Sequence, residues 1–176
     1  SKIGIVGLGY VGLPLAISFS KKYQVIGFDI NENRIAELKN AIDKTGEIRN
    51  TNLLKSESIS FSNDPLQLSQ CEVIIVAVPT PVDKGNKPDL KPLLFASKTV
   101  GEAILTSSHK VYISFESTVY PGCTEDDCVP VIEQYSNKKH GVGFSVGYSP
   151  ERVNPGDAEH TFESITKVVS GSCTDS

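Results

Sequence analysis

Short runs of hydrophobic residues alternate along this chain with longer segments in which apolar positions recur every three or four residues. The short runs predict strands, and the periodic segments predict helices. The expected strands span residues 3–6, 25–29, 58–62, 72–78, 110–115, 144–148 and 166–170, and the expected helices span residues 10–22, 32–41, 64–68, 90–105 and 124–135. Asn31 and Thr124 are expected to cap the second and the last of these helices. This alternation indicates an α/β fold with a doubly wound, mostly parallel sheet and helices on both faces.

The first strand runs directly into a glycine-rich turn, Gly7-x-Gly9-x-x-Gly12, at the start of a helix. In this fingerprint the first glycine makes the tight turn, the second lets the backbone approach a pyrophosphate, and the third lets the helix pack closely. The unpaired amides at the start of the helix lie at the positive end of its dipole, where phosphate binds. An apolar strand before the glycines, a helical pattern after them and an acidic residue downstream predict a Rossmann-type dinucleotide-binding domain.

The acidic residue is Asp29, at the end of the second strand and close to the ~20 residues expected after the fingerprint. A carboxylate there accepts hydrogen bonds from the ribose hydroxyls and repels a 2′-phosphate, which favours NAD over NADP. Arg34 is compatible with three roles: it could accept a phosphate, border or stack on the adenine, or solvate the start of its helix.

Composition narrows the class of protein. The chain has 176 residues, which fits one domain, and its net charge is −4 with scattered lysines, which gives no electrostatic footprint for nucleic acid. No stretch approaches the ~20 apolar residues of a membrane span. The first apolar segment is interrupted by glycines and followed by Lys21 and Lys22, unlike a signal peptide. We therefore expect a cytoplasmic protein without nucleic-acid or membrane partners.

The four cysteines are Cys71, Cys123, Cys128 and Cys173, and the three histidines are His109, His140 and His160. No C-x-x-C pair or histidine cluster is present, so neither a metal site nor a disulfide is expected. Cys71 opens a buried strand and is expected in the core. Cys123 and Cys128 flank a helix start, where a thiolate could be stabilised, but no base beside them is evident. The histidines are expected to be solvated.

Ligands of such a sheet bind beyond the carboxyl ends of its strands. Four segments follow strands there, namely 7–12, 78–81, 116–118 and 148–151. Thr80, Ser117 and Thr118 offer hydroxyls suited to ribose, a nicotinamide amide or an ordered water, and Glu151 offers a carboxylate near the reacting end. Thr80 and Ser117 could instead bond within their own turns, and Glu151 could be a helix cap or a surface ion-pair partner.

Five ordered motifs resemble the UDP-glucose/GDP-mannose dehydrogenase family. They are Gly7-Leu-Gly-Tyr-Val-Gly-Leu-Pro-Leu-Ala16, Gly27-Phe-Asp29 with Arg34, Val78-Pro-Thr-Pro81, Glu116-Ser-Thr-Val119 and Ser149-Pro-Glu151. Two further segments, Pro150-Glu-Arg-Val-Asn-Pro-Gly-Asp157 and Val119-Tyr-Pro-Gly-Cys-Thr124, resemble the branch that oxidises UDP-N-acetylhexosamines. This puts UDP-glucose in doubt as the substrate.

The resemblance implies that the C6 alcohol of a UDP-sugar is oxidised twice, to a carboxylate, with two NAD molecules and an aldehyde trapped on a cysteine. Glu151 is then the carboxylate that works with water in thioester hydrolysis, and Thr118 is the hydroxyl that holds water beside the nicotinamide. The implied cofactor-binding residues are Gly7, Gly9, Tyr10, Val11, Gly12, Asp29, Arg34, Val78, Pro79, Thr80, Ser117 and Thr118.

The family's nucleophile motif, Cys-x-Pro-Lys-Asp, does not occur in this sequence, and Cys173 lies in a different context. The resemblance therefore identifies residues 1–176 as the NAD-binding domain alone, without the central helix and the UDP-binding domain, and inactive by itself. The longer protein is expected to be a homodimer that completes the UDP-sugar site. The alternatives are a stand-alone dinucleotide-binding or sensing module, a UDP-glucose 6-dehydrogenase, and a relative of 6-phosphogluconate dehydrogenase.

Overall fold

The structure is a computed structural model that describes residues 1–48, 54–82, 85, 88–150 and 167–172. The strands are β1 (Lys2–Val6), β2 (Gln24–Phe28), β3 (Ile59–Ser62), β4 (Val73–Val76), β5 (Val111–Phe115), β6 (Phe144–Tyr148) and β7 (Ser170–Gly171). The helices are α1 (Gly12–Ser20), α2 (Glu32–Lys39), α3 (Lys91–Ile104) and α4 (Val129–Ser136), with a 3-10 helix, η2 (Pro65–Gln70), and a π turn, η3 (Thr124–Cys128).

The strands form one sheet in the order β3-β2-β1-β4-β5-β6-β7. The pairs from β3 to β6 are parallel, and only β7 runs antiparallel, beside β6. The chain reaches β3 at one edge and then crosses back over β1 to β4, so the strand order reverses between β1 and β4. Ligands of open α/β sheets bind outside the carboxyl ends of the strands at such a switch point. The predicted Rossmann-type sheet is therefore confirmed.

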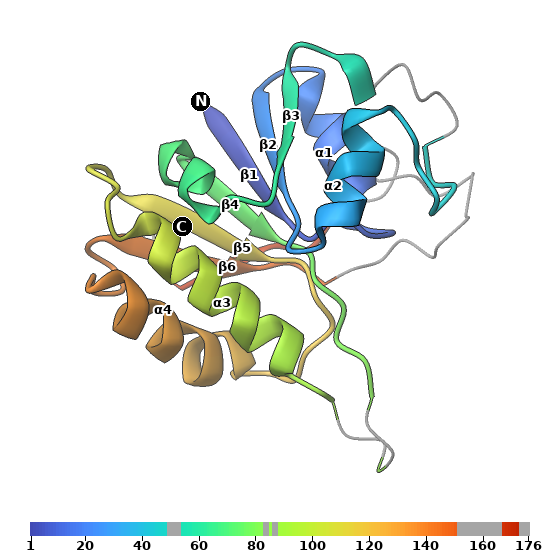
Figure 1. Cartoon of the computed structure of the whole chain (residues 1–176). Coiled ribbons are helices and arrows are strands. Elements are labelled where there is room, and N and C mark those ends of the chain that lie inside the picture. The colour runs from blue at the N-terminus through green and yellow to red at the C-terminus, as the bar shows by residue number, and fades with distance from the viewer. Residues whose placement is uncertain (49–53, 83–84, 86–87, 151–166, 173–176) are drawn as a thin grey trace.

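Both faces of the central strands are buried, in two separate cores. On β1, Ile3 and Ile5 pack into the core beneath α1 and α2, whereas Val6 belongs to the core beneath α3 and α4. On β4, Ile75 joins the first core and Ile74 the second, because successive side chains of a strand point to opposite faces. Figure 1 shows the α1–α2 pair over one half of the sheet and the α3–α4 pair over the other. Continuous apolar runs are typical of parallel strands buried on both faces.

The second half of the sheet is covered on one face only, within the described residues. The β5 side chains Val111, Ile113 and Phe115 are buried against α3 and α4, whereas Tyr112 and Ser114, which point to the other face, are half-buried. The prediction of helices on both faces thus holds for the sheet as a whole but not for each strand.

The helix starts follow the capping chemistry only in part. Asn31 caps α2 as predicted, because its side-chain oxygen accepts hydrogen bonds from the amides of Asn33 (3.0 Å) and Arg34 (3.3 Å). The first helix begins at Gly12, two positions later than predicted, because the preceding residues form the glycine-rich turn.

The prediction that Thr124 caps the last helix is wrong. Thr124 is buried inside a π turn whose N-terminal flank is Cys123, and no side chain caps it. The amide of Val129 donates to the Thr124 carbonyl, five residues back. The next residue, Pro130, has no amide hydrogen, so the ordinary bond four residues back is missing there and the turn widens.

The predicted strand over 166–170 is wrong in extent. β7 consists of Ser170–Gly171, and residues 167–169 form no strand, while residue 166 lies outside the described residues. Val168 and Val169 suggested a strand because they are β-branched, but both side chains are exposed. No core therefore favours extending the pairing with β6.

Gly12 is required by a close approach of backbone to backbone. A Cβ on residue 12 would lie 1.8 Å from the Gly7 carbonyl oxygen and 3.4 Å from Cβ of Ala77. Because backbone must shift to relieve this overlap, we expect Gly12→Ala to lower the free energy of unfolding by about 3 kcal/mol, measured by urea denaturation. Gly9→Ala is the matched control, since a Cβ there meets nothing within 4 Å. Equal stability of the two variants would contradict this account.

Candidate functional site

The glycine-rich turn has the geometry that the fingerprint predicts. Gly7 adopts φ +93°, a backbone conformation that side chains disfavour, and a Cβ on it would lie 2.9 Å from the Ala77 carbonyl oxygen. Gly12 starts α1 against the Gly7 carbonyl. Gly9 is different, because the space where its Cβ would be is open. That opening leaves room for a pyrophosphate to approach the backbone at the start of α1.

Asp29 follows β2 and is tied to the same turn. Its Oδ2 accepts a hydrogen bond from the Leu8 amide (2.8 Å), and its Oδ1 accepts one from the Asn31 amide (2.9 Å). Each carboxylate oxygen keeps a further lone pair, so the group can still accept hydrogen bonds from ribose hydroxyls. Asp29 thus supports the turn and also faces the ligand side.

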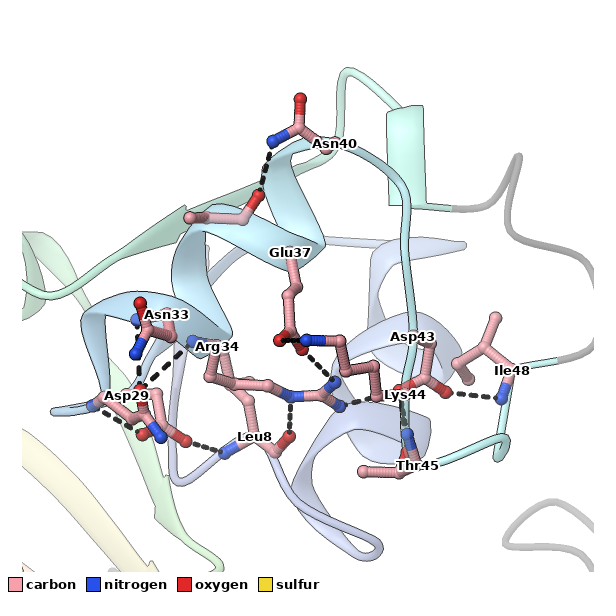
Figure 2. A network of polar contacts seen from close by, with 12 residues as sticks. Leu8, Asp29, Asn33, Arg34, Glu37, Asn40, Asp43, Lys44, Thr45 and Ile48 are labelled. Atoms are coloured by element: carbon pink, nitrogen blue, oxygen red, sulfur yellow. Dashed lines mark hydrogen bonds and ion pairs between the residues drawn. The ribbon is translucent and has the colours of Figure 1, made fainter.

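Arg34 holds the other end of the Leu8 residue. Its Nε donates to the Leu8 carbonyl (2.9 Å), and its Nη2 donates to Oδ1 of Asp43 (2.8 Å). Figure 2 shows the guanidinium between the turn and the Asp43 loop. Of the three roles considered for Arg34, solvating the start of its helix is wrong, since the side chain is only 10% exposed and bonded within the protein. A contact of Arg34 with a phosphate or with the adenine stays a prediction.

A cavity of about 310 Å³ lies at the switch point, beyond the carboxyl ends of β1, β2 and β4. Its lining includes the predicted residues Gly7, Gly9, Asp29, Val78 and Pro79. The other lining residues are mainly apolar, namely Val6, Leu8, Phe28, Ile30, Ala77, Pro92, Phe95, Ala96 and Thr99. Apolar walls with a single carboxylate suit an adenosine, whose flat base is apolar on both faces and whose ribose bonds to the acid. Tyr10 and Val11 lie in the adjoining turn, Tyr10 exposed and Val11 half-buried.

The loops after β4 and β5 are tied together by two crossed hydrogen bonds. Thr80 Oγ1 donates to the Thr118 carbonyl (2.7 Å), and Ser117 Oγ donates to the Val78 carbonyl (2.7 Å). Neither hydroxyl bonds within its own turn, so the local alternative is wrong for both. Each hydroxyl oxygen can still accept a hydrogen bond from a ligand. Thr118 itself is exposed on this rim.

The fourth predicted segment is described only as far as Pro150, and Glu151 lies outside the described residues. The amide of Ser149 donates to the Phe115 carbonyl (3.0 Å), so the end of β6 lies beside the end of β5. Glu116 is buried there and forms an ion pair with Lys167, which returns the chain to the same rim. Sequence reasoning missed this pair, because nothing local connects the two residues.

The described cysteines are buried and unsuited to nucleophilic chemistry. Burial raises the pKa of Cys71 and of Cys128 to about 12, and it also raises the pKa of Cys123. The core position predicted for Cys71 is confirmed. The expectation that a thiolate could be stabilised at Cys123 or Cys128 is wrong, because desolvation disfavours the charged form and Asp127 lies near both thiols.

Two histidines are not simply solvated, contrary to expectation. Nε2 of His109 donates to the Cys71 carbonyl (3.0 Å), and Nε2 of His140 lies 2.7 Å from Oγ of Ser172. His160 and Cys173 lie outside the described residues. Within the part of the chain that the structure describes, no group of three His, Cys, Asp or Glu side chains could hold a metal ion. No described helix is long and apolar enough to cross a membrane.

The switch-point cavity, the open Gly9 and the Asp29 carboxylate together define a Rossmann-type dinucleotide-binding domain. Residues 1–176 match the NAD binding domain of the UDP-glucose/GDP-mannose dehydrogenase family. The chain belongs to this family, and its cofactor is NAD.

Curated relatives match nearly the whole chain. It is 59% identical over 169 residues to protein CapL of Staphylococcus aureus, covering 96% of this chain and 39% of that protein. It is 52% identical to the UDP-N-acetyl-D-glucosamine 6-dehydrogenase of Pseudomonas aeruginosa, covering 97% of this chain and 40% of that protein. It is 47% identical, with the same coverage, to the enzyme of that name from Salmonella typhi. The chain thus spans about 40% of the length of these relatives.

Solved structures show the same fold. A ternary complex of GDP-mannose dehydrogenase from Pseudomonas aeruginosa superposes with a TM-score of 0.83 at 30% identity, covering 88% of this chain and 37% of that one. The UDP-D-ManNAc dehydrogenase from Pyrococcus horikoshii superposes with a TM-score of 0.81 at 30% identity, covering 97% of this chain and 41% of that one.

The open space at Gly9 generates a prediction about the cofactor. We expect Gly9→Ala to weaken NAD binding about tenfold or more, because the methyl group occupies the space through which the pyrophosphate approaches the backbone. Calorimetric titration with NAD measures the effect, and the melting temperature reports on folding. Val142→Ala, on an exposed turn at the opposite ends of the strands, is the control. Unchanged NAD affinity in Gly9→Ala would show that the pyrophosphate does not bind at this turn.

The raised thiol pKa values generate a second prediction. At pH 8 a thiol with a pKa near 12 is only ~10⁻⁴ thiolate, whereas an ordinary thiol with a pKa near 8.5 is about one quarter thiolate. We expect Cys71 and Cys128 to resist iodoacetamide in the folded chain and to react after unfolding in urea. Peptide mass spectrometry measures the labelling at each site. Rapid labelling of Cys128 in the folded chain would contradict its buried, protonated state.

Proposed function

We propose that this chain is the NAD-binding domain of a UDP-N-acetylhexosamine 6-dehydrogenase, which oxidises the C6 alcohol of its UDP-sugar to the uronic acid with two NAD. One observation carries the proposal: relatives named UDP-N-acetyl-D-glucosamine 6-dehydrogenase are 52% and 47% identical to the chain. Relatives named UDP-glucose 6-dehydrogenase, from Haloferax volcanii and Bacillus subtilis, are 28% and 32% identical. This difference favours the N-acetylated sugar over UDP-glucose.

The proposed binding mode follows the rim of the sheet. The pyrophosphate binds at the turn from Gly7 to Gly12, where α1 presents its first amides. The adenosine occupies the switch-point cavity with its ribose on Asp29. The nicotinamide half extends toward the crossed loops after β4 and β5, where Thr118 and Thr80 offer hydroxyl oxygens. When bound there, NAD supplies the hydride acceptor for the C6 carbon.

Residues of this chain have separate roles in the proposed reaction. Thr118 holds a water beside the reacting carbon, and Glu151 is the carboxylate that activates this water by taking its proton. The described thiols are buried and protonated, so the thiolate that traps the aldehyde is proposed to come from the part of the longer protein outside this chain. We propose that the chain alone binds NAD without turnover and that the longer protein is a cytoplasmic homodimer.

The decisive experiment is a substrate panel on the full-length gene product. UDP-GlcNAc, UDP-GalNAc, UDP-ManNAc and UDP-glucose are each incubated with NAD, and NADH and uronic acid are measured. We expect about two NADH per sugar oxidised with one of the N-acetylated substrates, since an alcohol reaches a carboxylate in two hydride transfers. One NADH per sugar with free aldehyde would contradict the double oxidation. No NADH with any of them, despite NAD binding, would favour a dinucleotide-sensing module.

The role of Glu151 is tested in the same assay. We expect Glu151→Gln to lower kcat by roughly 10²–10⁴, because the water then lacks its base, while the Kd for NAD stays near wild type. Glu57→Gln removes an exposed carboxylate before β3 and is the matched control. A kcat for Glu151→Gln equal to that of the control would exclude this role.

A further inference from the structure

We propose that Asp43, acting through Arg34, is a specificity-determining residue that makes this cofactor site select NAD over NADP. The inference rests on the NAD site described above and adds a residue outside the cavity lining. Asp43 lies in the loop after α2, away from the fingerprint in sequence. Its contacts connect it to the ribose side of the site.

Arg34 is the cation nearest to the ribose-binding carboxylate in the bonding network. Asp29 accepts from the Leu8 amide and Arg34 donates to the Leu8 carbonyl, so the two side chains hold opposite ends of one residue. In NADP-binding members of this fold class, an arginine near this position accommodates the 2′-phosphate. Arg34 therefore has the charge, and nearly the place, to bind a 2′-phosphate if its side chain were free to turn outward.

Asp43 prevents that movement. Its carboxylate is fully buried, and its Oδ1 accepts from Nη2 of Arg34 at 2.8 Å. The same carboxylate accepts from the amide and hydroxyl of Thr45 (3.1 and 2.7 Å) and from the amide of Ile48 (3.0 Å). Figure 2 shows these bonds converging on Asp43 from its own loop and from α2. The carboxylate is thus fixed by its loop and in turn fixes the guanidinium.

Protonation does not release Arg34 near neutral pH. Burial raises the pKa of Asp43, but hydrogen bonds from Thr45, Ile48 and Arg34 outweigh it and hold the pKa below its ordinary value. Asp43 therefore stays ionised, and the charge-assisted bond to Arg34 persists.

The charges around Arg34 favour a dinucleotide without the extra phosphate. Two carboxylates face the guanidinium, Asp43 at 2.8 Å and Glu37 at 3.8 Å from its nitrogens, and Lys44 pairs with Glu37. Together with Asp29, the group carries three negative charges against two positive ones. A 2′-phosphate would add about two further negative charges at pH 7. Removing the Asp43 charge makes the group neutral and frees a guanidinium that can pair bidentately with phosphate.

Arg34 also has a spare donor. Its Nη1 is buried and makes no hydrogen bond to any described residue, lying only within ion-pair distance of Glu37. A buried donor without an acceptor is costly, so a new acceptor gains more than at an exposed arginine. The 2′-phosphate of NADP offers such an acceptor once Asp43 no longer holds Nη2.

The test measures the ratio Kd(NADP)/Kd(NAD) by calorimetry on the full-length gene product. We expect Asp43→Ala and Asp43→Asn to lower this ratio about tenfold or more, because each removes the charge that holds Arg34. Asp43→Asn keeps the side-chain volume and provides the measurement if the alanine variant does not fold. Glu57→Gln is the matched control, because it removes an exposed carboxylate outside the network around Arg34, so its ratio should stay at the wild-type value.

The Arg34→Gln background distinguishes a role of Asp43 that acts through Arg34 from a merely structural role. If Asp43 acts through Arg34, Asp43→Asn should leave the ratio unchanged in Arg34→Gln protein. The same fall in both backgrounds, or no fall in wild type with either Asp43 variant, would overturn the inference and leave the proposed function intact. A wild-type protein that binds NADP more tightly than NAD would instead overturn the NAD-dependent function itself.

Discussion

The cofactor side of this domain depends on how the residue Leu8 is held between β1 and α1. Its amide is bound by Asp29, just after β2, and its carbonyl by Arg34 of α2, so these two residues fix the conformation of the turn that joins β1 to α1. A turn with glycines at positions 7, 9 and 12 is costly to order alone, because glycine loses more conformational freedom on folding than any other residue. The neighbouring elements remove its freedom before any ligand arrives, so a cofactor does not have to supply the free energy of ordering it.

The sequence predicts the parts of this site that follow from local chemistry. Short continuous apolar runs placed the parallel strands, and the glycines located the turn. Asp29 followed from its distance along the chain, and Asn31 followed from cap chemistry. These features depend on residues close in sequence or on a spacing set by one βαβ unit. They account for the parallel sheet and for the dinucleotide.

What could not be predicted depends on contacts between distant segments. The bond from Thr80 to the Thr118 carbonyl and the pair of Glu116 with Lys167 each join segments that only the folded sheet brings together. The contact of Asp43 with Arg34 spans nine residues and depends on how the loop after α2 folds back on that helix. The π turn and the short β7 show the opposite case, in which a local pattern suggested regular structure and the surroundings prevented it. β7 stays short because Val169 has no core to pack against, and the π turn forms because Pro130 has no amide hydrogen. The spacing of apolar residues along the sequence carries no information about either constraint.

The crossed bonds between the loops after β4 and β5 bear on how such a site can diverge. At positions 80 and 117 the side-chain hydroxyl itself makes the tie, whereas at position 118 the tie uses only the backbone carbonyl. Any residue type can supply that carbonyl. Position 118 can therefore change its side chain through evolution, and with it the chemistry presented to a ligand, while the two loops stay fastened. Positions 80 and 117 lack that freedom, because their side chains make the hydrogen bonds. New reactions can therefore evolve at this site through changes at residue 118 alone, with the conformation of the two loops unchanged.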